Sequence, residues 1–215
     1  PYAAISRIGQ RSAARYPILC HQDVLADQGA GATELLAALE QLDAIDPHWV
    51  VAGTAGVMRS GRLVRRVLDP DGGSTGEVLP LPVVTLDGLF LVFNRRNSPR
   101  CSTDIPEYHL YGSDVCLHAL SAGGSAYVID FPVTHLARRP GRRASPAVER
   151  ATSRFIAAWS QRCWFRYVPT SVGTFFVSRS KLLRRFFGSE YAGALIGGYT
   201  DVHWGSDLRL LDRYS

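Results

Sequence analysis

Short apolar runs alternate along the chain with stretches in which hydrophobic residues recur at helical spacing. Such runs are typical of buried strands, and the i, i+3, i+4 repeat is typical of amphipathic helices. The predicted strands are 18–20, 49–52, 83–86, 89–93 and 126–129, with a hairpin over 57–67; the predicted helices are 2–15, a segment entered near 33, 113–122 and a long helix from 146. We therefore predict an α/β sandwich whose mixed, mostly parallel sheet is flanked by helices.

The composition of the chain changes after His135. A basic loop follows, and Ser145-Pro146 then supplies an N-cap and a first-turn proline for the long helix. The rest of the chain is aromatic and arginine-rich. We predict two parts, an α/β core over residues 1–137 and, over 138–215, the basic loop with a helical C-terminal extension.

Composition narrows the class of protein. The chain has 215 residues, of which 46% are hydrophobic and 20% charged, which excludes disordered, collagen-like and coiled-coil proteins. The net charge is +5, and Lys181 is the only lysine among 24 basic residues. Arginine binds phosphate, so nucleotides, lipid headgroups and nucleic acids are candidate partners. A GC-rich coding bias explains the arginine excess equally well.

The cysteines and the longest apolar runs indicate in which cellular compartment the protein is expected. Four widely spaced cysteines form no C-x-x-C pair, which argues against a zinc ribbon or a dense disulfide framework and favours a reducing compartment. No apolar run approaches the roughly 20 residues of a membrane-spanning helix. We expect a cytoplasmic protein that at most contacts the inner face of a membrane.

Ionisable side chains follow several predicted strands. Asp23, Asp87 and His135 each come after a strand, and Asp114 opens a helix. Ligands of open α/β sheets bind beyond the carboxyl ends of the strands, so we expect Asp23, Asp114 and His135 to gather there around one ion. Carboxylate and imidazole ligands predict Mg²⁺ or Mn²⁺. Each aspartate alone is also a common turn or cap residue.

Four blocks in order resemble motifs of bacterial family 2-like glycosyltransferases of the GT-A fold. They are Leu19-Cys20-His21-Gln22-Asp23-Val24, Val84–Val92, His109–Leu117 and Val128–His135, and the resemblance covers roughly residues 1–165. It implies an inverting, metal-dependent glycosyltransferase, hexosyltransferase-like, that transfers a sugar from a nucleotide-sugar donor to a glycan or lipid-linked acceptor in bacterial polysaccharide biosynthesis. Donor sugar, nucleotide base and acceptor are not specified by these motifs.

The resemblance assigns a role to each matching residue. Asp23 and His135 would hold the metal, and His21, at the first position of an Asp-x-Asp motif, would contact the donor. Asp114 would take the proton of the acceptor hydroxyl; its alternative is a helix cap. The remaining predicted donor- and acceptor-binding residues are Asp87, Gly88, His109, Tyr111, Arg138, Arg139, Arg142 and Arg143. The four arginines would close over the diphosphate, or form a solvated linker.

GT-A enzymes usually begin with a strand–helix–strand segment that has no counterpart here. We therefore expect an N-terminally incomplete core, whose exposed sheet edge favours a homodimer.

Two other functions stay open. A His-x-Asp pair at a strand end also suits a metal-dependent phosphoesterase, and a non-catalytic sugar- or nucleotide-binding domain fits the charge. Nucleic acid is not an expected partner, because no aromatic-basic RNA-binding motif is present. The segment Arg184-Arg185-Phe186-Phe187 suits either a peripheral membrane contact or a buried helix with a charged outer face.

Overall fold

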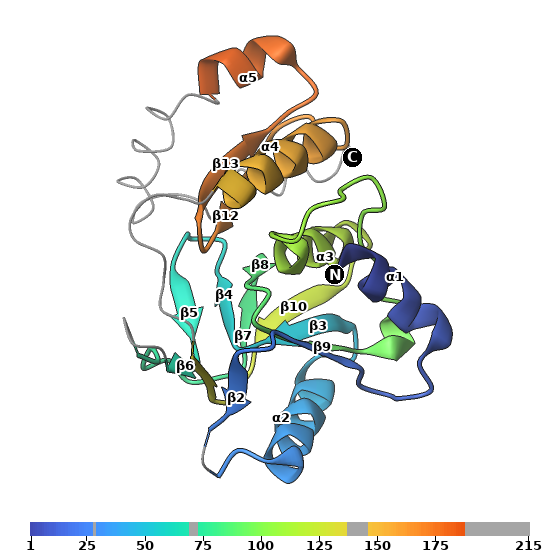
Figure 1. Cartoon of the computed structure of the whole chain (residues 1–215), viewed down its shortest axis with the longest axis vertical. Coiled ribbons are helices and arrows are strands. Elements are labelled where there is room, and N and C mark those ends of the chain that lie inside the picture. Colours follow the sequence, from blue (N-terminus) through green and yellow to red (C-terminus); the bar gives the residue numbers. More distant parts are fainter. Residues whose placement is uncertain (28, 69–72, 137–145, 188–215) are drawn as a thin grey trace.

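A five-stranded sheet lies at the centre of the computed structural model, which describes residues 1–27, 29–68, 73–136 and 146–187 (Figure 1). The strand order is β1-β9-β3-β10-β7. These strands are β1 (Ile18–Cys20), β3 (Trp49–Gly53), β7 (Leu81–Val83), β9 (Phe90–Phe93) and β10 (Ser125–Val128). In this sheet β3 and β10 are the parallel pair, and the other neighbours are antiparallel.

Three smaller sheets surround the central one. One has the order β2-β11-β6, a second β5-β4-β8, and the third is the hairpin β12-β13. Their strands are β2 (Val24–Ala26), β4 (Ala55–Val57), β5 (Leu63–Arg65), β6 (Val67–Leu68), β8 (Thr85–Leu86), β11 (Val133–His135), β12 (Arg166–Thr170) and β13 (Gly173–Val177).

The predicted α/β class is confirmed, but the prediction of a mostly parallel sheet is wrong. The antiparallel neighbours in the central sheet, β1 with β9, β9 with β3 and β10 with β7, are distant in sequence, so the path of the whole chain sets their direction and the local strand pattern does not.

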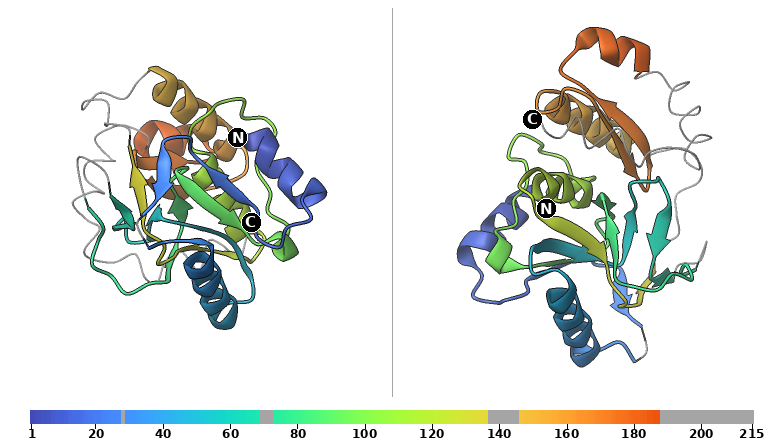
Figure 2. Two further views of the ribbon diagram at one scale, coloured as in Figure 1. Left: turned by 60° about the horizontal axis from the view of Figure 1, so that its bottom comes forward. Right: turned by 180° about the vertical axis from the view of Figure 1, so that it is seen from behind.

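Helices cover both faces of the central sheet. The helices of the described residues are α1 (Tyr2–Arg11), α2 (Ala32–Ile45), α3 (Tyr111–Ser121), α4 (Pro146–Ser160) and α5 (Lys181–Phe187), with a 3-10 turn, η1 (Arg95–Asn97). Of these, α5 packs on the hairpin β12-β13 and not on the central sheet. Figures 1 and 2 show α2 on one face of the sheet, α1 and α3 on the other, and α4 with its hairpin beyond α3. The sheet therefore separates two hydrophobic cores.

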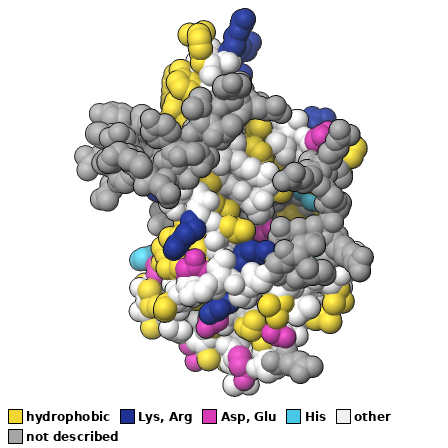
Figure 3. All heavy atoms as spheres, turned by 90° about the vertical axis from the view of Figure 1, so that its left-hand side faces the viewer, with side chains coloured by type: hydrophobic (Ala, Val, Ile, Leu, Met, Phe, Trp, Pro, Cys, Tyr) yellow, Lys and Arg dark blue, Asp and Glu magenta, His cyan; other side chains and the backbone are white. Residues whose placement is uncertain are grey.

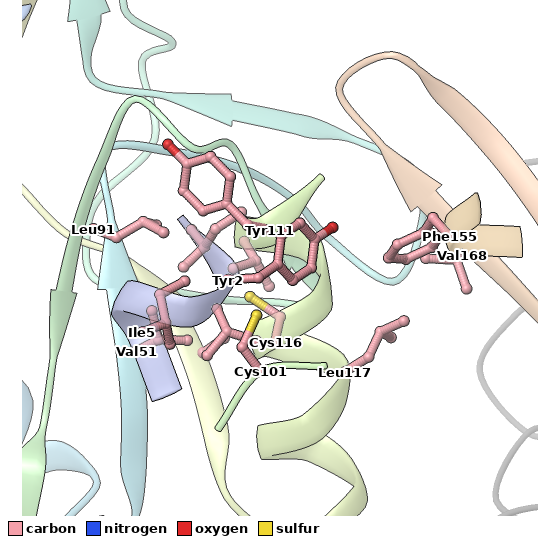
Figure 4. Close-up of a cluster of buried hydrophobic side chains, with 14 of the residues drawn as sticks. Tyr2, Ile5, Val51, Leu91, Cys101, Tyr111, Cys116, Leu117, Phe155 and Val168 are labelled. Carbon is pink, nitrogen blue, oxygen red and sulfur yellow. The ribbon is translucent and has the colours of Figure 1, made fainter. Parts of the chain in front are cut away.

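Strand β9 shows how the sequence builds both cores. All four of its residues are buried; Leu91 and Phe93 join the core of α1 and α3, while Phe90 and Val92 join the core of α2. Successive side chains of a strand point to opposite faces, so a continuous apolar run is what a strand between two helical layers requires. Figure 4 shows the core of α1 and α3, where Ile5 of α1 lies near side chains of α3 and the sheet.

The C-terminal part differs from the predicted helical extension. It contains α4 and α5 but also the hairpin β12-β13. Phe155 and Trp159 of α4 are buried in the same core as Leu117 of α3. The division at residue 137 stays a prediction.

One face of the molecule shows how the side chains are distributed on it (Figure 3). On the face in Figure 3, hydrophobic, basic and acidic side chains are interspersed, and hydrophobic and basic groups gather at the top, where α5 lies. None of the described helices is long and apolar enough to cross a lipid bilayer.

Candidate metal centre

The predicted metal ligands lie on two neighbouring segments, the turn before β2 and the end of β11. The N–H of Val24 donates to the His21 carbonyl at 3.2 Å, which closes a tight turn that contains Asp23. In the antiparallel β2–β11 ladder His135 pairs with Val24, and the N–H of Leu136 donates to the Asp23 carbonyl at 2.9 Å. The register of this ladder therefore brings His135 beside Asp23.

Three side chains converge at this point. One ligand atom of each of His21, Asp23 and His135 lies within 4.8 Å of the other two. His21 Nδ1 contacts Asp23 Oδ1, and His135 Nε2 lies 3.3 Å from Asp23 Oδ2. The side chains are 24%, 24% and 16% exposed, so the group opens to solvent.

The two imidazoles favour the charged form of the carboxylate. Partial burial raises the pKa of Asp23, but the hydrogen bond to His21 and the charges of His21 and His135 lower it, and the net shift of this pKa is downward. The carboxylate is therefore ionised at neutral pH, which is the form that binds a metal ion.

Two nitrogens and one oxygen form the donor set of the three side chains. Ligand atoms about 2.1 Å from a tetrahedral Zn²⁺ lie roughly 3.4 Å apart, so small side-chain rotations would bring all three onto one ion. Imidazole suits Zn²⁺ and Fe²⁺, whereas Mg²⁺ prefers oxygen ligands and keeps most of its waters. Of the two predicted ions, this donor set therefore suits the transition metal Mn²⁺ better than Mg²⁺.

His21 joins this group as a third candidate ligand, whereas the resemblance implied that it contacts the donor. Its signal was the His-x-Asp spacing immediately after a strand. What the sequence could not show is the tight turn, which directs the His21 ring toward Asp23.

Aromatic side chains pack beside the candidate metal ligands. The Tyr108 ring is 49% exposed and stands edge-on to the His21 ring, with centroids 6.0 Å apart. His109 and Tyr111 pack on the same tyrosine at 5.8 and 6.2 Å. Two residues of the predicted acceptor side therefore lie close to the metal ligands, with Tyr108 between.

Asp87 and Gly88, predicted to bind the donor or the acceptor, lie in a turn that is held from two sides. The hydroxyl of Tyr111 donates to the Gly88 carbonyl, and the N–H of Asp87 donates to the Ala55 carbonyl at 2.9 Å. A Cβ on Gly88 would lie 2.5 Å from the Tyr111 ring, so this position needs glycine. Since the N–H of His21 donates to the Leu89 carbonyl at 2.8 Å, this turn also supports the metal ligands.

Asp114 lies in the core, apart from the three ligands. Its side chain is fully buried and accepts hydrogen bonds from Cys101 Sγ at 2.9 Å, from the N–H and Oγ of Ser102 at 2.7 Å each, and from Trp159 Nε1 at 2.8 Å. A buried carboxylate with four donors is not available to an external acceptor. We therefore assign Asp114 a structural role in place of the predicted one as catalytic base.

His118 completes the polar surroundings of Asp114. Its Nε2 lies 3.1 Å from Ser102 Oγ and 3.8 Å from an Asp114 oxygen. Arg162 donates to the same Ser102 hydroxyl at 2.9 Å. This cluster joins α3, the loop at Ser102 and the end of α4.

The predicted diphosphate-binding arginines, Arg138, Arg139, Arg142 and Arg143, lie outside the described residues. Their role stays a prediction.

Comparisons with known proteins give one relevant match. No family model matches the chain. A curated protein of Fuscovulum blasticum, described as "ATP synthase subunits region ORF 6", is 39% identical over 138 residues, which make up 60% of this chain and 54% of the relative. The chain spans about half the length of this relative.

This match overturns the resemblance to glycosyltransferases. The description of the relative names an open reading frame of an ATP synthase subunits region and no glycosyltransferase. The predicted family is therefore wrong, and so are the enzyme class of a hexosyltransferase-like glycosyltransferase and the transfer of sugars in polysaccharide biosynthesis. The convergence of His21, Asp23 and His135 is independent of that resemblance, because it rests on the geometry of the fold.

Proposed function

We propose that this protein binds a divalent transition-metal ion through His21, Asp23 and His135, and binds an anionic ligand through that ion. The observation that carries the proposal is the convergence of two imidazole nitrogens and a carboxylate within 4.8 Å. Among the residues that the structure describes, these three form the one such group.

Three protein ligands leave coordination positions on the ion for another molecule. Sites with two histidines, one carboxylate and an open position are typical of functional rather than purely structural metal centres. When bound, the ion would act as a Lewis acid toward an oxygen of that molecule.

The charge of the site favours an anion. Two neutral imidazoles and one carboxylate leave a divalent ion with a net charge of about +1. The chain as a whole carries +5. A phosphate-bearing molecule such as a nucleotide fits both charges, and the half-exposed Tyr108 packs edge-on against the His21 ring.

Isothermal titration of the chain with Zn²⁺, Mn²⁺ and Mg²⁺ tests the metal. We expect one Zn²⁺ per chain, bound more tightly than Mn²⁺ and much more tightly than Mg²⁺. His135→Ala and Asp23→Ala should each weaken Zn²⁺ binding by at least about tenfold. His48→Ala, which removes an exposed histidine elsewhere, is the matched control and should bind as the unchanged chain does.

Inorganic phosphate titrated into the zinc-loaded chain tests the anion. Binding that requires zinc and is lost in His135→Ala supports the proposal. Zinc binding that survives in both ligand variants contradicts the metal site, whereas zinc binding without any effect of phosphate contradicts only the anionic ligand.

A further inference from the structure

The positive charge of this chain is concentrated in one segment. Residues 150–187 contain eight Lys or Arg residues and no Asp or Glu. Elsewhere 16 basic residues stand against 19 acidic ones, so the net charge is +8 in this segment and −3 in the rest of the chain. Such a separation indicates that the segment meets an anionic partner.

Helix α5, at the end of this segment, has one apolar side packed and another exposed. Phe187 packs its ring on Phe165 and Phe176 of the hairpin, at centroid distances of 5.8 and 5.6 Å. Leu182 and Phe186 lie one turn apart on a neighbouring side of the helix and are 64% and 68% exposed. The hairpin thus anchors α5 and leaves two large apolar side chains in water.

Basic residues flank the exposed apolar side. Lys181 and Arg185 are also one turn apart and exposed, about 100° around the helix from Leu182 and Phe186. Large apolar side chains beside Lys and Arg on one exposed helix are typical of helices that lie in a membrane interface.

Hydrogen bonds tie the backbone before α5 to the segment that contains the exposed Trp164. Trp164 is 63% exposed, and Ser178, two residues before Ser180, donates its hydroxyl to the Trp164 carbonyl. Ser180 in turn accepts the N–H of Arg184 at 3.0 Å in the first turn of α5. We call the surface formed by Lys181, Leu182, Arg184, Arg185 and Phe186 of α5 the α5 patch.

We propose that the α5 patch binds the surface of an anionic lipid bilayer, with Leu182 and Phe186 among the headgroups and the basic side chains on lipid phosphates. The apolar pair distinguishes this partner from a nucleic acid, which needs the positive charges but gains little from an exposed leucine. The seven described residues of α5 are far too few to span a bilayer, so this helix would lie on the surface.

Sedimentation of the whole chain with vesicles tests the proposal. We expect binding to vesicles of phosphatidylglycerol and phosphatidylcholine, little binding to phosphatidylcholine alone, and weaker binding as salt rises. The double variant Leu182→Ser, Phe186→Ser should lower the partition coefficient by at least about tenfold. Arg184→Gln with Arg185→Gln should lower it by a similar factor.

Variants on other elements of the chain provide the controls. Leu36→Ser with Ile45→Ser removes two comparably exposed apolar side chains from α2, and Arg11→Gln with Arg59→Gln removes two exposed charges. Both should bind vesicles as the unchanged chain does, and circular dichroism checks that each variant is folded.

Three results would overturn the proposal. The first is absence of binding to the anionic vesicles. The second is an equal loss of binding in the α2 variant. The third is binding of an oligonucleotide that depends on Arg184 and Arg185, together with vesicle binding that is insensitive to Leu182 and Phe186.

Discussion

Histidine and aspartate side chains of this chain occupy two different environments, and the environment determines what each can do. His21, Asp23 and His135 are partly exposed, and their ligand atoms face one another. Asp114 is fully buried, and its oxygens accept hydrogen bonds from four donors. His21, Asp23 and His135 can replace their contacts with one another by contacts with an ion, whereas Asp114 connects segments of the core.

Replacement of the buried carboxylate should lower stability and leave metal binding intact. Asp114→Asn turns an acceptor into a donor that faces other donors, so we expect a loss of about 3 kcal/mol in the free energy of unfolding. Urea denaturation measures this loss. Asp104→Asn removes a half-exposed partner of Arg162 and should cost less than about 1 kcal/mol. Zinc affinity lowered by Asp114→Asn in the folded protein would contradict the separation of the two groups.

The pH dependence of stability should report on His118. Burial lowers the pKa of His118; the charge of Asp114 raises this pKa in part, and that of Arg162 lowers it. The unfolded chain therefore binds a proton near pH 6.5 that the folded chain takes up only at lower pH. Above about pH 6.5 the protonation of His118 therefore does not reduce the free energy of unfolding. As the pH falls below about 6.5, the proton bound by the unfolded chain reduces this free energy.

A substitution isolates the effect of His118. His118→Gln should flatten the decline in unfolding free energy between about pH 6.5 and 5, measured by urea denaturation with EDTA present. His48→Gln, at an exposed position, should keep the slope of the unchanged chain. Identical slopes for the chain and His118→Gln would show that His118 does not carry this dependence.

At the scale of elements, the site depends on how α3 and the β2–β11 ladder meet the central sheet. Helix α3 begins against the end of β8, where a Cβ on Gly112 would lie 2.6 Å from the Leu86 carbonyl oxygen and 2.9 Å from that of Asp87. Backbone atoms cannot yield as a flexible side chain can. The close approach of Gly112 therefore fixes the start of α3 and the position of Tyr111.

Gly112→Ala should push α3 away from the sheet. We expect a loss of about 1–3 kcal/mol in the free energy of unfolding, the usual cost of overpacking a core. Thermal denaturation followed by circular dichroism measures it. Ser121→Ala at the exposed end of the same helix should change stability by less than about 0.5 kcal/mol, and an equally tolerant Gly112→Ala would contradict the close packing described for α3.

Elements marked by strong periodicity or by glycine were predictable from sequence. The apolar runs at 18–20 and 89–93 match β1 and β9, and the helix at 113–122 matches α3 to within two residues at its start. The hairpin β12-β13 was not predicted, because Pro169 lies inside a strand and the aromatic residues suit helix and strand alike.

The sequence predicted one part of the site, the meeting of Asp23 and His135, but not the burial of Asp114. Asp23 and His135 meet through the register of two short strands, and their pairing was expected from the strand ends. Asp114 has the same local pattern as a site residue, but Trp159 from α4 closes over it, a contact between distant segments. A position at the end of a strand or at the start of a helix therefore could not distinguish a candidate metal-binding residue from a residue of the core.

At the scale of the whole molecule, a bound ion would link the turn after β1 to β11, two segments distant in sequence. A ligand that binds only the folded chain raises its stability, by about 2.7 kcal/mol at a concentration 100 times the dissociation constant. For a chain of this size the melting temperature should rise by about 5–10 °C with Zn²⁺ and return with EDTA. His135→Ala should abolish the rise; a rise that persists in this variant would place the ion elsewhere.

The most direct test of the metal centre is the position of the ion itself. Crystals of the chain grown with Zn²⁺ would be measured on both sides of the zinc absorption edge. We predict one anomalous peak about 2.0–2.2 Å from nitrogens of His21 and His135 and from an oxygen of Asp23. A peak on other residues, or its absence from these three at saturating zinc, would contradict the account.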